Sequence, residues 1–158
     1  MAHAPTAQAA IDIHAPAEHV YDIIADVTTL PDWAAETTRC IWLDGAAGPA
    51  VGARFKGINQ HNARKWYTVC TVTKAERGAE FAFQVKVFGF PSAKWGYRLE
   101  PTETGCRVTE YTRRGEPRWI AVWVNRILFG IRDRDEHNQQ NIERTLAALK
   151  VRAEKAAV

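Results

Sequence analysis

The sequence lacks any long apolar run. No window approaches the roughly 18 apolar residues that a membrane-spanning helix needs. Residues 1–10 also lack the basic start and the following apolar block of a secretory signal. We therefore expect a cytoplasmic protein with no stable membrane insertion.

Cysteine is scarce as well. The three cysteines, Cys40, Cys70 and Cys106, are odd in number and far apart, and each lies in a strand-like segment rather than in a pairing motif. This usage is typical of reduced residues that pack in a core. We expect no disulfide.

Motifs for cofactors and covalent catalysis are also missing. The glycine-rich residues 45–52 lack the Gly-Lys-Ser/Thr ending that cradles phosphate, and no serine or cysteine stands in a recognised nucleophile motif. His14 and His61 fall at strand or hairpin ends, where we expect them on the surface. His19 and His137 fall on expected helices with no second ligand at metal spacing. We expect neither a cofactor nor a metal ion.

What is present is an ordinary globular composition. The chain has 158 residues, of which 46% are hydrophobic and 25% charged, enough for one domain over residues 1–158 with an ordered core of about residues 8–154. The net charge of +3 comes from basic and acidic residues that are interleaved along the chain, so no nucleic-acid partner is indicated.

The first segments read as a strand and a short helix. Residues 9–14 alternate like a strand, with Ile11 and Ile13 on one face. Residues 17–27 place apolar side chains at helical spacing after Pro16, which suits a helix start. The sequence at residues 30–33 breaks this helix, and Asp32 could cap one further turn.

From residue 37 the pattern changes to a period of two, which predicts five or six more strands. The short connections between them predict an antiparallel meander. The expected strands are residues 37–43, 53–59, 65–74, 80–88, 93–99 and 106–114, with residues 60–64 as one hairpin turn.

Alternation assigns one face of these strands to the interior. This face is large, aromatic and dotted with polar groups. Its expected members are Phe55, Gly57 and Asn59; Trp66, Thr68, Cys70 and Val72; Phe81, Phe83, Val85 and Val87; Trp95, Tyr97 and Leu99; and Val108, Glu110 and Thr112.

Residues 117–155 predict one long or once-broken helix. Ile127 and Ile131, and later Ile142, Leu146 and Leu149, follow a core-facing line at helical steps. Between these two runs the same line passes through Asp135 and Asn138. Either the helix lines a cavity at its middle, or a bend near Gly130 turns both polar groups to solvent.

The order of these elements resembles the START-like helix-grip superfamily (SRPBCC), in particular the polyketide cyclase/dehydrase and lipid-transport proteins. The resemblance is carried by residues 11–21 (IDIHAPAEHVY), 30–33 (LPDW), 52–57 (GARFKG) and 107–110 (RVTE). It implies an α+β fold in which a curved antiparallel sheet of six or seven strands wraps a long C-terminal helix, with two short helices after the first strand. It also implies a hydrophobic cavity that takes lipid-like, steroid-like or polyketide-like molecules.

From this we expect non-covalent binding of a small hydrophobic, lipid-like or polyketide-like ligand by a monomer or weak homodimer. The alternative is a polyketide cyclase or dehydratase in which Glu110, Tyr97 or Asp135 transfers protons. A third possibility is an interaction module that uses the apolar run at residues 119–123. The expected ligand-binding residues are Phe55, Asn59, Trp66, Phe83, Trp95, Tyr97, Glu110, Asp135 and Asn138.

The roles of Glu110 and of the apolar run at residues 119–123 each have competing explanations. Glu110 points inward, where it could anchor a ligand or instead form a structural ion pair with Arg134 or Arg98. Trp119 and Trp123 could rim the cavity, meet a second subunit, touch a membrane or pack locally under the preceding loop.

Overall fold

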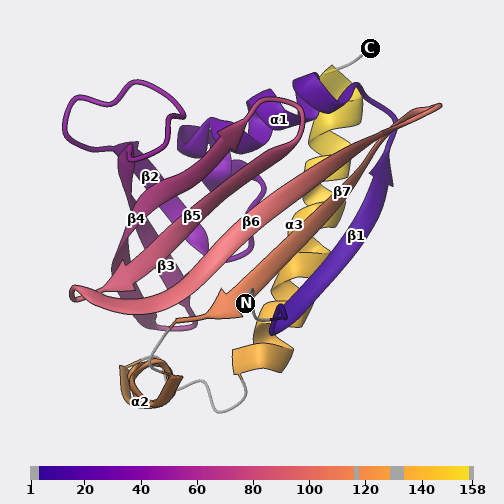
Figure 1. Cartoon of the computed structure of the whole chain (residues 1–158). Helices are drawn as coiled ribbons and strands as arrows, with labels where there is room; N and C mark the ends of the chain where they lie inside the picture. The colour runs from indigo at the N-terminus through magenta and orange to yellow at the C-terminus, as the bar shows by residue number, and fades with distance from the viewer. Residues whose placement is uncertain (1–3, 116–117, 129–133, 157–158) are drawn as a thin grey trace.

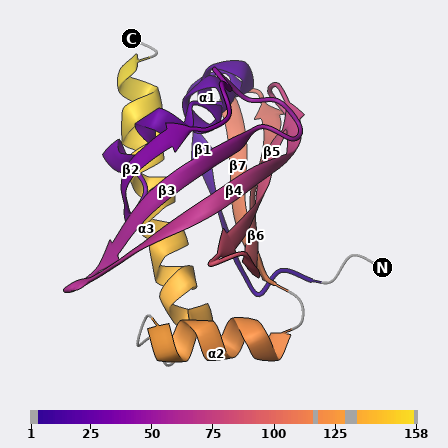
Figure 2. The ribbon, with the colours of Figure 1, turned by 90° about the vertical axis from the view of Figure 1, so that its left-hand side faces the viewer.

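The computed structural model describes residues 4–115, 118–128 and 134–156. Its centre is one seven-stranded antiparallel sheet with the strand order β1-β7-β6-β5-β4-β3-β2 (Figure 1). The sheet curves around a long C-terminal helix, and short helices follow the first strand (Figure 2). The expected α+β helix-grip class is confirmed.

The strands match the expected segments to within one to three residues at each end, and half of the ends are longer than expected. Sequence neighbours pair from β2 to β7, and β1 then pairs with β7 to complete the sheet. The strands are β1 (Ala7–Ile13), β2 (Thr37–Trp42), β3 (Arg54–His61), β4 (Arg64–Glu76), β5 (Glu80–Val87), β6 (Phe90–Thr102) and β7 (Gly105–Arg114).

The hairpin between β3 and β4 is tighter than the sequence indicated. His61 pairs with Arg64, so only Asn62 and Ala63 form the turn instead of residues 60–64. Asn62 has φ 53°, a left-handed conformation that asparagine tolerates better than most residues. As a result, His61 is held by the sheet rather than by a loose loop.

Helix α1 (Ala17–Ala25) packs Val20, Tyr21 and Ile24 into the core, as its spacing indicates. A 3₁₀ helix, η1 (Val27–Asp32), follows it. Its capping side chain is Asp26, which accepts a hydrogen bond from the Thr28 backbone N–H. The expected cap, Asp32, is wrong: Asp32 ends η1 and pairs instead with Arg152.

The C-terminal segment forms two helices, α2 (Arg118–Leu128) and α3 (Arg134–Ala156). This is the once-broken version of the expected helix, and α2 lies crosswise at the start of α3 (Figure 2). Gly130 and Ile131, on which the expected bend and part of the apolar line rested, lie outside the described residues. Among the described residues, no helix combines the length and apolarity required to cross a membrane.

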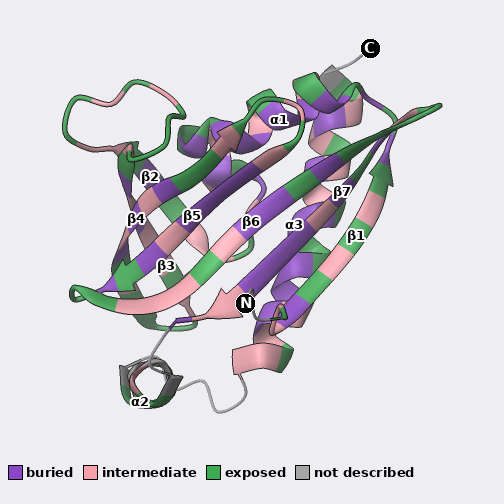
Figure 3. Cartoon of the chain, viewed as in Figure 1, coloured by how far each residue is buried: buried purple, intermediate pink, exposed green. Residues whose placement is uncertain are grey.

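The core lies between the concave face of the sheet and α3 (Figure 3). Ile142, Leu146 and Leu149 are buried on α3, and each contributes about 1.5–3 kcal/mol by leaving water. The inward strand residues expected from alternation are buried or half-buried. Cys40, Cys70 and Cys106 are buried free thiols, which confirms them as packing residues.

Candidate functional site

A cavity of about 140 Å³ lies between the concave face of the sheet and α3. All the side chains expected to bind a ligand line this cavity, although their contact with a ligand stays a prediction. They are Phe55, Asn59, Trp66, Phe83, Trp95, Tyr97, Glu110, Asp135 and Asn138.

Aromatic rings form much of the cavity wall. The rings of Phe55 and Phe83 meet edge to face with centroids 5.1 Å apart, and Trp33 supports Tyr97 in the same way at 5.9 Å. Such pairs add about 0.5–1.5 kcal/mol to the burial of their area and fix the ring positions. These rings therefore form a firm apolar part of the wall that would suit a flat or cyclic ligand.

Glu110 is the buried acid of this wall. It is 3% exposed, and β-sheet register places it directly opposite Tyr97, whose hydroxyl donates to Glu110 Oε1 over 2.9 Å. Its other oxygen, Oε2, has no partner among the described residues. Burial raises the pKa of Glu110 to about 8, although the Tyr97 hydrogen bond acts in the opposite direction. At neutral pH this side chain is mostly a neutral acid that can donate a hydrogen bond.

The ion pair expected for Glu110 is wrong for both arginines considered. Arg134 pairs with Glu36 at 3.1 Å, and Arg98 lies 3.7 Å from Glu80. Because burial favours the neutral form of the Glu110 carboxyl, the side chain carries little charge for a cation to pair with.

Asp135 and Asn138 face the sheet, so the cavity-lining register of α3 is right and the solvent-facing alternative is wrong. Asp135 Oδ1 accepts a hydrogen bond from the Arg114 guanidinium of β7 over 2.6 Å. Asn138 is 6% exposed and lines the cavity, and its Oδ1 has no partner among the described residues. The cavity therefore holds a buried acceptor in addition to the donor on Glu110.

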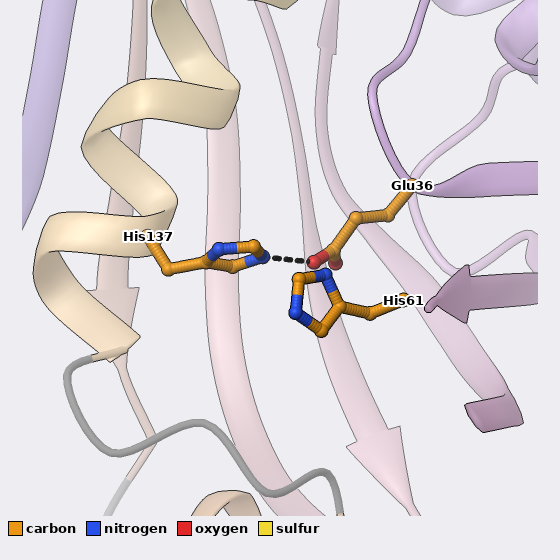
Figure 4. A group of neighbouring side chains, drawn as sticks. All are labelled: Glu36, His61 and His137. Atoms are coloured by element: carbon orange, nitrogen blue, oxygen red, sulfur yellow. Dashed lines mark hydrogen bonds and ion pairs between the residues drawn. The ribbon is translucent and has the colours of Figure 1, made fainter. Parts of the chain in front are cut away.

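A second polar group lies at the edge of the cavity, and sequence reasoning missed it. Glu36 precedes β2, lines the cavity, and contacts both Arg134 and His137 at the start of α3. Burial favours the neutral acid, yet Arg134 and His137 together hold the pKa of Glu36 below its usual value. His61 joins them from β3, with its ring centroid 4.5 Å from that of His137 (Figure 4). Glu36, His61 and His137 are far apart in sequence, and no local motif connects the three.

The apolar run on α2 does not pack under the preceding loop. Trp119 is 66% exposed and Trp123 is 62% exposed, so local packing of these two rings is wrong. Val122 and Ile127 are also exposed on this helix.

Comparison with known proteins gives a family match over nearly the whole chain. A model of the family described as polyketide cyclase / dehydrase and lipid transport matches residues 4–154. No curated protein matches the chain significantly.

Solved structures share the fold. Protein TTHA0849 from Thermus thermophilus is 18% identical with a TM-score of 0.70, and the match covers 96% of this chain and 99% of that one. Protein CV1439 from Chromobacterium violaceum is 16% identical with a TM-score of 0.67, and the match covers 93% of this chain and 96% of that one. The polyketide cyclase-like protein Cgl2372 from Corynebacterium glutamicum is 28% identical with a TM-score of 0.56, covering 94% and 88%.

Proposed function

Because this chain belongs to the polyketide cyclase/dehydrase and lipid transport family, we propose that it binds a small hydrophobic ligand non-covalently in the cavity between the sheet and α3. The ligand is lipid-like or polyketide-like and carries at least one hydroxyl or carbonyl oxygen. The single observation that carries the proposal is Glu110, a buried acid on the cavity wall with one oxygen unpartnered among the described residues.

The volume limits how much of the ligand is enclosed. The cavity measures about 140 Å³, close to the roughly 150 Å³ of an engineered apolar cavity that binds benzene. The enclosed part is thus about one ring in size. A larger ligand would bury one ring among Phe55, Phe83 and Trp95 and leave the rest at the mouth.

The polar groups define the chemistry of that enclosed part. Protonated Glu110 offers a donor, and Asn138 Oδ1 offers an acceptor. An unpartnered buried polar group costs about 1–3 kcal/mol, so a ligand that meets either group recovers part of this free energy. A phenol or alcohol oxygen can accept from Glu110 and donate to Asn138, whereas a hydrocarbon can do neither.

The test compares 2-naphthol with naphthalene by fluorescence titration. We expect 2-naphthol to bind the wild-type protein about 5- to 10-fold more tightly, the value of one net hydrogen bond. Glu110→Leu should reduce this preference, with only the share that Asn138 contributes remaining, while retaining affinity for naphthalene. The matched control is Glu100→Leu, which makes the same replacement at an exposed position of β6 and should keep the preference. Equal affinities for the two probes in the wild-type protein would reject the proposed anchor.

The second candidate function is a cyclase or dehydratase reaction on a polyketide-like substrate. One observation favours it: a pKa of about 8 lets Glu110 give or take a proton near neutral pH. Glu110→Gln keeps the shape and much of the hydrogen bonding but removes proton transfer. In an enzyme, this change should lower turnover about 10²- to 10⁴-fold at unchanged affinity. For a carrier, we expect only a modest change in binding.

A further inference from the structure

Glu36, His61 and His137 bring three metal-ligating side chains together at the edge of the cavity. One ligand atom from each lies within 4.8 Å of the others. They come from the segment before β2, the end of β3 and the first turn of α3, and their side chains converge on one point (Figure 4). We propose that these three residues bind a divalent transition-metal ion of the Zn²⁺ type.

The donor set determines the class of ion. Two imidazoles and one carboxylate suit zinc and neighbouring first-row metals, whereas calcium and magnesium prefer oxygen ligands alone. Metal–ligand bonds of about 2.0–2.1 Å in a tetrahedral arrangement place the ligand atoms about 3.3 Å apart. On binding, Glu36 Oε1 and His137 Nε2, now 2.5 Å apart, would separate slightly. His61 would close its remaining distance to them, up to about 1.5 Å, by side-chain rotation.

The carboxylate is already oriented for this role. His137 Nε2 lies 2.5 Å from Glu36 Oε1, while the Arg134 guanidinium donates to Glu36 Oε2 over 3.1 Å. Arg134 contacts both carboxylate oxygens, Oε1 over 3.4 Å and Oε2 over 3.1 Å, and so fixes the orientation of the carboxylate, as partners of metal ligands commonly do. Its positive charge also opposes the ion, so the site should bind more weakly than a closed structural zinc site.

The surroundings of the group separate it from a chance surface cluster. The side chains of Glu36, Arg134 and His137 are each at most 17% exposed. Asn141 of α3 also reaches His137 Nε2, at 3.2 Å, and would move aside or reorient when the nitrogen binds an ion. Because Glu36 also lines the cavity, the ion would lie in the cavity wall.

Three protein ligands leave a fourth position open, which is the arrangement of catalytic rather than structural zinc sites. Water fills this position in the absence of another donor. This inference does not depend on which hydrophobic ligand the cavity binds, or on whether it binds one.

The experiment is a titration of chelator-treated protein with Co²⁺, followed by absorbance, and with Zn²⁺, followed by calorimetry. We expect one saturable equivalent, with the visible Co²⁺ bands of low-symmetry nitrogen and oxygen coordination. His61→Gln and His137→Gln should each weaken binding by about 10-fold or more, in line with the loss of one ligand. The matched control is His14→Gln, because His14 is exposed and lies near Glu154, about 25 Å along α3 from His137.

Circular dichroism without metal shows whether each variant is folded. If a variant does not fold, the titration of the wild-type protein alone still shows whether the site binds metal. No saturable binding by the wild-type protein would overturn the proposal. Equal binding by the wild-type protein and all three variants would also overturn it, because the ion would then occupy another place.

Discussion

Tyr97 and Glu110 lie directly opposite each other on β6 and β7, and the Tyr97 hydroxyl donates to Glu110 Oε1 over 2.9 Å inside the protein. The pair is buried at the wall of the cavity. Burial keeps Glu110 mostly protonated at neutral pH, so the pair presents a hydrogen-bond donor to the cavity rather than a charge. This arrangement gives rise to two predictions that need no knowledge of the ligand.

The first prediction concerns stability against pH. The pKa of Glu110 is about 8 in the folded protein and 4.5 ordinarily, so the folded protein holds a proton that the unfolded chain releases between these values. The contribution of Glu110 is complete below about pH 4.5 and is lost as the pH rises through about 8. Relative to Glu110→Gln, the free energy of unfolding of the wild-type protein should fall by up to about 1.4 kcal/mol per pH unit in this window. Urea denaturation at three pH values measures the free energy of unfolding of both proteins. If it changed with pH by the same amount in both, the buried neutral acid would be contradicted.

The second prediction concerns Tyr97→Phe. The Tyr97 hydrogen bond opposes the effect of burial, so its removal should raise the pKa of Glu110 further. Carbon-13 NMR of labelled glutamate side chains would follow the titration of this carboxyl directly. A control variant, Tyr67→Phe, removes a hydroxyl from an exposed residue of β4 and should leave the Glu110 titration unchanged. A lower pKa in Tyr97→Phe would show that the hydroxyl stabilises the neutral acid instead.

The third prediction tests the grip of the sheet on α3. Leu146 is 2% exposed, so Leu146→Ala should reduce the free energy of unfolding by about 2–5 kcal/mol through lost burial and the space left behind. Val151 lies on the same helix but is 55% exposed. Val151→Ala should therefore change the free energy of unfolding by about 0.5 kcal/mol or less. Urea denaturation compares the two. Similar losses for both variants would contradict the assignment of the buried face.

Much of the fold could be predicted from the sequence because local patterns encode it. Alternation placed Phe83, Tyr97 and Glu110 on one face of the sheet, and helical spacing placed Asn138 on α3 across the same cavity. These assignments need only the periods of a strand and a helix. Choosing which nearby polar side chain caps a turn requires backbone geometry, so Asp32 was expected where Asp26 caps η1.

The group of Glu36, His61 and His137 could not be predicted in the same way. Its members meet only because the curved sheet brings the end of β3 and the segment before β2 to the start of α3. His61 was expected on a surface hairpin, and the tight turn at Asn62 instead holds it in the sheet, half-buried. Neither spacing nor composition carries that information. The exposure of Trp119 and Trp123 likewise depends on how α2 is placed.

The most direct measurement of the central claim is NMR of methyl-labelled protein during titration with 2-naphthol. We expect one saturable site, with intermolecular NOEs from the probe to the methyl groups of Leu30, Val85 and Val87, which line the cavity. Val122 and Ile127, exposed on α2, should show none. Contacts confined to Val122 and Ile127, or shifts that fail to saturate, would contradict the cavity as the binding site and favour α2 as an interaction surface.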